Sequence, residues 1–139
     1  QYRIGGRPVS VSDIDVPIFS VSTTSDHVAP WRSVYKLHLL ADTSVTFVLT
    51  NGGHNAGIVS EPGHEGRSFR IRTTGESENY LSPEAWEAAA ESRDGSWWPA
   101  LADWLRQRSS GEAAPPGLGT STGRYRAIED APGSYVFQR

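Results

Sequence analysis

The chain has 139 residues, of which 37% are hydrophobic and 21% charged, and this size and composition predict one domain with a single core. Its formal net charge is −3, which excludes the general basic field of a protein that binds nucleic acid or acidic lipid. It contains no cysteine, which excludes disulfides, thiolate metal sites and a cysteine nucleophile within these residues.

The chain also lacks a long apolar run and an initiating methionine. No apolar stretch approaches the roughly 20 residues that cross a bilayer, so we expect no membrane span. Because the chain has no methionine and begins at Gln1, we expect a processed product or an excised part of a larger protein.

The first half of the chain has the pattern of a strand, a helix and a second strand. Residues 8–12 alternate between apolar and polar and predict a short edge strand or an arm. Residues 16–22 and 44–50 are apolar and β-branched, as in strands that are buried on both faces of a parallel sheet. Between them, apolar residues at helical spacing predict a helix over 31–40. This order predicts a βαβ unit.

The second half begins with residues 67–73, whose alternation predicts a third strand or an extended arm. A helix follows over 83–92, because Ser82 has the side chain of an N-cap and a proline takes the first helical position. A second helix is expected over 97–108, with Ser96 as its cap.

These elements predict the α/β class, with few parallel strands and flanking helices. We divide the single domain into a strand-helix-strand segment over 1–75, two helices over 76–111 and an extended tail over 112–139. The tail is predicted from its proline and glycine pairs, which favour turns.

Two titratable residues follow the two buried strands. Asp26 lies in the loop after the first strand and His54 in the loop after the second. Functional side chains collect beyond the carboxyl ends of parallel strands, so the two loops are expected to converge. A carboxylate beside an imidazole fixes its tautomer, and His54 would then act as a general base for a third residue. The structural alternative is that both are solvated or capping residues.

Other candidate residues favour structural roles. His27, His38 and His64 are spread along the chain without an H-x-x-x-H spacing, so no metal site is expected. Trp97 and Trp98 are adjacent and cannot both face inward from one helix face, so one is expected to be exposed.

Four motifs carry a resemblance to a known family. They are SDHVAPWRSVY at 25–35, GHNAGIV at 53–59, GSWWP at 95–99 and APGSYV at 131–136. In this order, and over essentially the whole chain, they resemble the C-terminal part of polyhydroxyalkanoate synthases, the poly(3-hydroxybutyrate) polymerases.

The resemblance implies a fold and an activity. Members of the family have an α/β-hydrolase-like catalytic domain and use a Cys-His-Asp triad to polymerise 3-hydroxyacyl-CoA thioesters with release of coenzyme A. By motif match Asp26 corresponds to the triad aspartate and His54 to the triad histidine. The chain would then be the C-terminal portion of the catalytic domain, with the cysteine upstream, and would be inactive alone.

The resemblance also implies partners and a location. The substrate is the coenzyme A thioester, the second partner is the growing polyester chain, and no cofactor is needed. The location would be the cytoplasm, at the surface of polyester granules. Without the preceding strands, the sheet would expose an edge, so we expect a homodimer through that edge or a loose fold.

Two alternatives stay open. One is a non-enzymatic module that binds a polymer or a protein partner and has kept the motifs. The other is half of an α/β-hydrolase esterase or depolymerase, because Asp26 and His54 would serve a serine nucleophile equally well.

Overall fold

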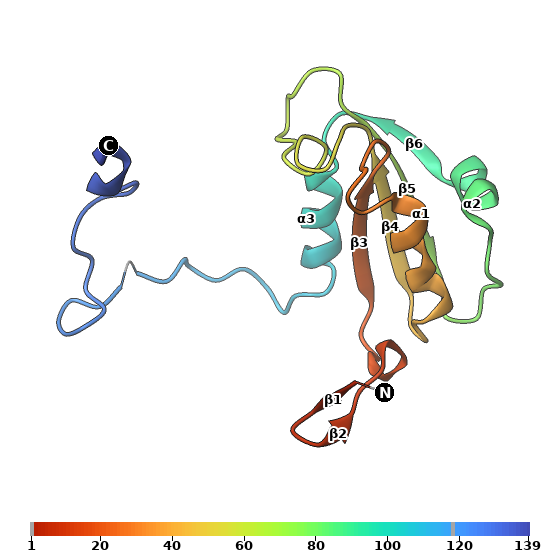
Figure 1. Cartoon of the computed structure of the whole chain (residues 1–139), viewed down its shortest axis with the longest axis horizontal. Helices are drawn as coiled ribbons and strands as arrows, with labels where there is room; N and C mark the ends of the chain where they lie inside the picture. Colours follow the sequence, from red (N-terminus) through yellow and green to blue (C-terminus); the bar gives the residue numbers. More distant parts are fainter. Residues whose placement is uncertain (1, 118) are drawn as a thin grey trace. The chain divides into compact units, whose positions relative to one another are not determined.

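A four-stranded sheet with the order β3-β4-β5-β6 forms the centre of the protein (Figure 1). The computed structural model describes residues 2–117 and 119–139. The strands are β3 (Ile18–Thr23), β4 (Val45–Thr50), β5 (Ser68–Thr74) and β6 (Glu91–Asp94). The strands expected over 16–22, 44–50 and 67–73 are therefore confirmed, and β6 is an addition.

The sheet is mixed. β3 and β4 are parallel and in register from Ile18 opposite Val45 to Thr23 opposite Thr50, whereas β4–β5 and β5–β6 are antiparallel. The expectation of parallel strands is correct only for the first pair. A parallel return needs a crossover, usually a helix. Helical turns fill the connection from β3 to β4, but residues 51–67 between β4 and β5 form turns only, and β5 returns antiparallel.

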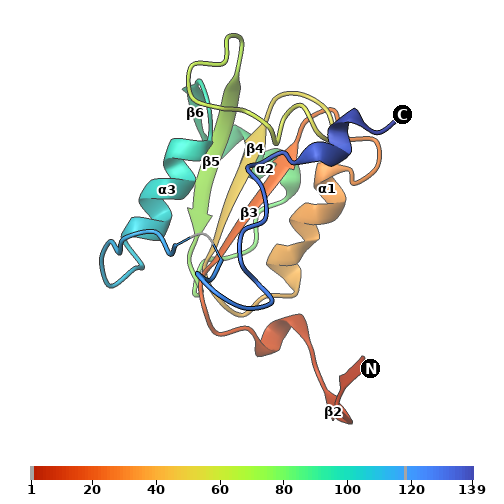
Figure 2. The same ribbon diagram turned by 90° about the vertical axis from the view of Figure 1, so that its left-hand side faces the viewer.

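Strand β4 lies at the centre of the core, and all six of its residues are buried. On one face Phe47 and Leu49 pack against Trp31, Tyr35 and Trp86. On the other face β4 contributes Val48, which packs in a second cluster with Phe69 of β5 and with Trp97. The two views place α1 and α2 over one face of the sheet and α3 over the other (Figures 1 and 2). Burial on both faces is therefore confirmed for β4. It is wrong for β3, which lies at the edge of the sheet and is only half-buried from Ile18 to Val21.

The helices are shorter than expected. They are α1 (Trp31–Val34), which continues as the 3-10 helix η2 (Tyr35–Leu39), then α2 (Pro83–Ala89) and α3 (Trp98–Arg106). The cap at Ser82 is confirmed, since its hydroxyl accepts from the Ala85 N–H at 3.2 Å.

The other helix ends need correction. Residues 91–94 pair with β5 as β6 instead of continuing α2. The N-cap of α3 is Trp97 and not Ser96, although the Ser96 hydroxyl does accept from the Trp98 N–H at 3.0 Å.

The N-terminal segment also differs from its prediction. β1 (Arg3–Ile4) and β2 (Arg7–Pro8) form a short antiparallel hairpin. The expected strand over 8–12 gives way to the 3-10 helix η1 (Val11–Asp13). The reason is local, because the Asp13 carboxylate accepts from the Ser10 N–H at 2.7 Å and closes a helical turn.

The chain divides into two units, one ending at Arg108 and the other beginning at Ser109, and each is described by itself. The second unit has little regular structure, with a bridge between Gly119 and Arg126 and the 3-10 helix η3 (Ser134–Phe137). Among the described residues, no helix has both the length and the hydropathy that a membrane span requires.

Candidate active site

The loops that follow β3 and β4 lie side by side because the parallel ladder continues past both strand ends. The Thr24 N–H donates to the Thr50 carbonyl at 2.9 Å, and the Ser25 N–H donates to the Gly52 carbonyl at 3.0 Å. Asp26 comes directly after Ser25, and His54 comes two residues after Gly52. The backbone therefore brings together two residues that are 28 positions apart in the sequence.

The Asp26 carboxylate uses its two oxygens differently. Oδ1 accepts the backbone N–H groups of Val28 and Ala29, each at 2.8 Å. Oδ2 lies 2.8 Å from Nδ1 of His54. The loop residues after Asp26 thus fix the carboxyl group and leave Oδ2 for the imidazole.

These contacts set the charge of Asp26. The Ala29 N–H, followed by the His54 ring, outweighs burial and lowers the pKa of Asp26 from 3.8 to about 2. Asp26 is therefore a carboxylate at neutral pH and accepts a hydrogen bond from His54, so Nδ1 donates. In the neutral ring Nε2 then has the lone pair and faces away from the carboxylate.

Exposure differs between the two partners. The His54 side chain is 48% exposed and that of Asp26 only 9%. A group outside these two loops can therefore approach His54 while the carboxylate behind it stays shielded. A shielded carboxylate behind an oriented and accessible imidazole is the arrangement that a general base needs.

The loop around His54 is fixed at its base. The Asn51 amide donates to the Gly66 carbonyl at 2.7 Å, and its oxygen accepts from the Ser68 N–H at 3.2 Å. Within the loop the Gly57 N–H donates to the Gly53 carbonyl at 3.0 Å, which closes a turn around His54.

Three further residues contact this loop, and sequence reasoning gave them only structural roles, as a helix cap for Ser96 and in packing for Trp97 and Trp98. Trp97 and Trp98 donate their indole N–H groups to the carbonyls of Gly57 and Ile58, and Ser96 donates its hydroxyl to the Ser60 carbonyl. The signal was present as the GSWWP motif, but the motif does not say which segment it contacts. Trp98 is 38% exposed and Trp97 only 7%, so the expectation that one of them is exposed is confirmed.

An apolar groove of about 430 Å³ runs beside the loop of His54. It is formed by the end of the loop and by one side of α3. Its lining residues are Ile58, Val59, Trp97, Trp98, Leu101, Ala102 and Leu105.

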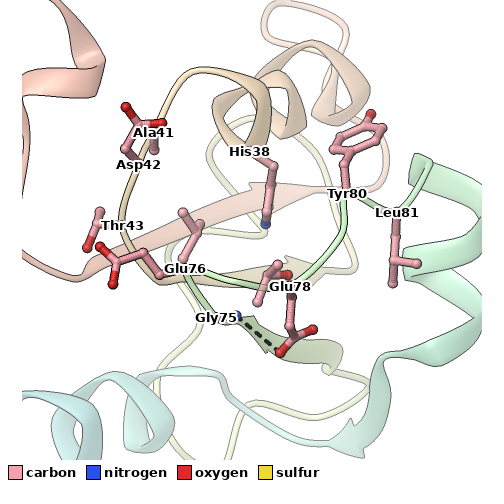
Figure 3. A pocket seen from close by; sticks show the side chains of 11 residues that line it. His38, Ala41, Asp42, Thr43, Gly75, Glu76, Glu78, Tyr80 and Leu81 are labelled. Carbon is pink, nitrogen blue, oxygen red and sulfur yellow. Dashed lines mark hydrogen bonds between the residues drawn. The ribbon is translucent and has the colours of Figure 1, made fainter.

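A polar hollow of about 220 Å³ lies near the amino end of β4, opposite the end that leads to His54. Figure 3 shows the His38 ring in this hollow and the Glu78 carboxylate turned to the Gly75 N–H. Nδ1 of His38 donates to the Tyr35 carbonyl at 3.0 Å, and burial lowers the pKa of His38. Nε2 of His38 has no hydrogen-bond partner among the described residues, so this histidine is not oriented by a carboxylate.

The other two histidines, His64 and His27, lack the arrangement seen at His54. His64 pairs with the Glu61 carboxylate at 3.0 Å, three residues away in the same exposed turn. His27 is exposed. Across residues 2–117 and 119–139, no group of three or more His, Cys, Asp or Glu side chains gathers as metal ligands would. Asp26 and His54 are therefore the pair whose contact joins two strand ends.

The chain matches known polymerases over nearly its whole length. It is 39% identical over 98% of its residues to a poly(3-hydroxyalkanoate) polymerase subunit of Cupriavidus necator. It is 34% identical over 99% to poly(3-hydroxyalkanoate) polymerase 2 of Ectopseudomonas oleovorans, and 34% identical over 98% to a polymerase subunit of Rhizobium etli. No protein-family model matches the chain. The resemblance found in the sequence motifs is thereby confirmed.

These matches cover only part of each relative. The chain spans 22%, 24% and 20% of the length of the three polymerases, so it corresponds to about a fifth of a curated relative.

Proposed function

We propose that this chain, a relative of the poly(3-hydroxyalkanoate) polymerases, forms the C-terminal part of an α/β-hydrolase-like acyltransferase and supplies its acid–base pair. The observation that carries the proposal is the 2.8 Å contact between Nδ1 of His54 and Oδ2 of Asp26. The substrate would be a 3-hydroxyacyl-CoA thioester and the product a polyester. The expected location at polyester granules in the cytoplasm belongs to the same proposal.

The roles follow from the hydrogen-bond directions. The Asp26 carboxylate accepts a hydrogen bond from the protonated Nδ1 of His54. Nε2 is therefore the atom that removes a proton from the nucleophile. We assign the nucleophile to a cysteine thiol upstream of these residues, because the thiolate and not the thiol attacks a thioester. The thiolate adds to the acyl carbonyl, the coenzyme A sulfur leaves, and the protonated His54 returns the proton to it.

Chain growth needs a second proton transfer. The 3-hydroxyl group of one acyl unit must lose its proton as its oxygen attacks the acyl carbonyl of another. Both Asp26 oxygens already accept hydrogen bonds from Val28, Ala29 and His54. Nε2 of His54 is the better base for this step, because the His54 side chain is 48% exposed and no described residue hydrogen-bonds to Nε2.

The test is a chimaera in which this chain replaces the matching segment of a curated polymerase. Release of coenzyme A from 3-hydroxybutyryl-CoA is then measured for the parent chimaera and for Asp26→Asn and His54→Ala. Loss of acid–base catalysis should lower kcat by about 10²–10⁴-fold in each variant. His64→Ala is the matched control, since His64 is also paired with a carboxylate in the same loop but is expected to keep parental activity.

Two outcomes would contradict the proposal. One is parental turnover in His54→Ala, which is also what a purely polymer-binding or partner-binding module predicts. The other is an inactive parent chimaera beside an active donor polymerase. The upstream cysteine of the chimaera is also replaced by serine. If turnover is seen only with that serine, the esterase or depolymerase alternative is favoured instead.

A further inference from the structure

The start of α3 reaches the loop of His54 through three side chains. We propose that Ser96, Trp97 and Trp98 are positioning residues, which fasten the loop over 57–60 and thereby hold His54 against Asp26. We call these three residues the loop clamp. The proposal rests on the proposed function, because positioning matters only if His54 takes part in the reaction.

The hydrogen bonds of the clamp all end on main-chain carbonyls. The indole N–H of Trp97 donates to Gly57 at 3.1 Å and that of Trp98 to Ile58 at 2.9 Å. The Ser96 hydroxyl donates to the carbonyl of Ser60, a residue with no exposed surface. Contacts to carbonyls restrain the backbone itself, and the segment over 51–60 has no helix or strand to restrain it otherwise.

The loop also packs closely against β3. A methyl group at Gly57 would lie 2.5 Å from Cγ2 of Thr23 and 2.8 Å from the Asn51 carbonyl oxygen. Thr23 is the last residue of β3, three positions before Asp26. Gly57 therefore lies close to the strand that leads to Asp26, and its carbonyl accepts the hydrogen bond of Trp97.

The restraint reaches His54 through one turn. The Gly57 N–H donates to the Gly53 carbonyl, so the residues on both sides of His54 are tied to the clamped position. Movement of Gly57 would carry His54 away from Oδ2 of Asp26.

Not every tryptophan of the chain makes such a contact. The indole N–H of Trp104, on the same helix, is buried without a hydrogen-bond partner among the described residues. Trp104 instead packs edge-on against Phe19, with ring centroids 5.5 Å apart. Trp104→Phe therefore removes an indole from α3 without removing a contact to the loop, and it is the matched control.

The experiment uses the 139-residue chain and needs no turnover. Carboxyl ¹³C NMR follows the titration of Asp26, and amide hydrogen exchange is followed at Gly57 and Val59. The variants are Trp98→Phe, Trp97→Phe and Ser96→Ala, with Ser96→Thr as the variant that keeps the hydroxyl. Loss of one clamp contact should speed exchange at these amides by about 5-fold, the usual net effect of one hydrogen bond.

The titration separates positioning from simple packing. The His54 contact is one cause of the low pKa of Asp26, so a displaced histidine raises that pKa from about 2 toward 3.8. We expect this rise in Trp98→Phe, Trp97→Phe and Ser96→Ala, and parental titration in Trp104→Phe and Ser96→Thr. Trp98 is 38% exposed, so Trp98→Phe should keep the fold even where Trp97→Phe does not.

Parental titration and exchange in both Trp98→Phe and Ser96→Ala would overturn the clamp. This failure is distinguishable from failure of the proposed function. A clamp that positions His54 in a chimaera without turnover would leave the positioning correct and the catalytic role wrong. If the clamp variants have no effect but the chimaera needs His54 for turnover, the catalytic role is correct and the positioning role is wrong.

Discussion

At the residue scale, the site depends on the separate hydrogen-bond partners of the two Asp26 oxygens. Oδ1 is occupied by two backbone N–H groups of its own loop, so the carboxylate is oriented before any partner arrives. Oδ2 is then directed at Nδ1 of His54. Asp26 thus acts at once as the cap of its loop and as the partner of the histidine.

Acidification should weaken the fold through Asp26. Its pKa in the folded chain is about 2, below the ordinary 3.8, so its carboxylate stabilises the fold above about pH 3.8 and this contribution is lost as the pH falls through 2. Asp26→Asn keeps an oxygen for Val28 and Ala29 but removes the charge. The difference in free energy of unfolding between the parent and Asp26→Asn should therefore shrink on acidification. Urea unfolding at about pH 5 and about pH 2.5 measures it, and an unchanged difference would contradict the assignment.

Gly57 has no room for a side chain. Its missing Cβ would overlap Thr23 and Asn51, so Gly57→Ala should destabilise the chain by about 1–3 kcal/mol, as overpacking does. Gly53→Ala is the matched control in the same loop, because its Cβ would meet only the Ser25 carbonyl oxygen at 4.0 Å. Thermal and urea unfolding of the two variants provide the comparison. Equal stability of both would show that the loop moves freely away from β3.

At the scale of elements, the sheet has two different edges. β6 is short, exposed and rich in charge, and such residues discourage pairing with another chain. β3 is longer and carries Ile18, Phe19 and Val21 at the other edge. The Ile18 N–H donates to the Ser44 carbonyl beside β4, so alternation directs the N–H groups of Phe19 and Val21 outward.

We expect the chain to dimerise through the β3 edge. Sedimentation should then show association that rises with concentration, because outward N–H groups gain partners on pairing. Hydrogen exchange provides the site: the amides of Phe19 and Val21 should become protected as dimer forms. The amides of Ser20 and Ser22, which face β4, are the internal control and should be protected at every concentration. A monomer at all concentrations would contradict the expectation.

The elements that sequence reasoning found are those whose pattern is local. Strands within 16–22 and 44–50 are recognisable because both runs are apolar and β-branched, although only the second is buried along its whole length. β6 was not recognisable, since Glu91–Asp94 is polar throughout and becomes a strand only by pairing with β5. The antiparallel direction of β5 was missed for a related reason. It depends on the absence of a crossover helix from the connection over 51–67.

The candidate site could likewise be predicted only in part. That Asp26 and His54 would approach each other could be predicted, because each follows a buried strand of one βαβ unit. The fastening of the loop by Trp97 and Trp98 could not, since the donors lie 40 residues from their acceptors and no spacing rule relates them.

At the scale of the whole molecule, the pair and its loop belong to the first of the two units, which ends at Arg108. The hydrogen bonds of Asp26, His54 and the loop clamp all join residues within the first unit. A chain that ends at Arg108 should therefore keep the low pKa of Asp26. NMR titration of the shortened chain checks this, and a normal Asp26 titration there would show that residues 109–139 support the site.

The separation between the loop and its clamp also imposes an order in time. During synthesis Asp26 and His54 leave the ribosome well before Trp97 and Trp98, which come 40 residues after the carbonyls they bind. The parallel pair β3–β4 can form early, with both titratable residues already in place on their loops. The loop that carries the histidine is fastened only when the GSWWP motif emerges. A nascent chain released before that point would contain both Asp26 and His54 but would lack the three side chains that fasten the loop of His54.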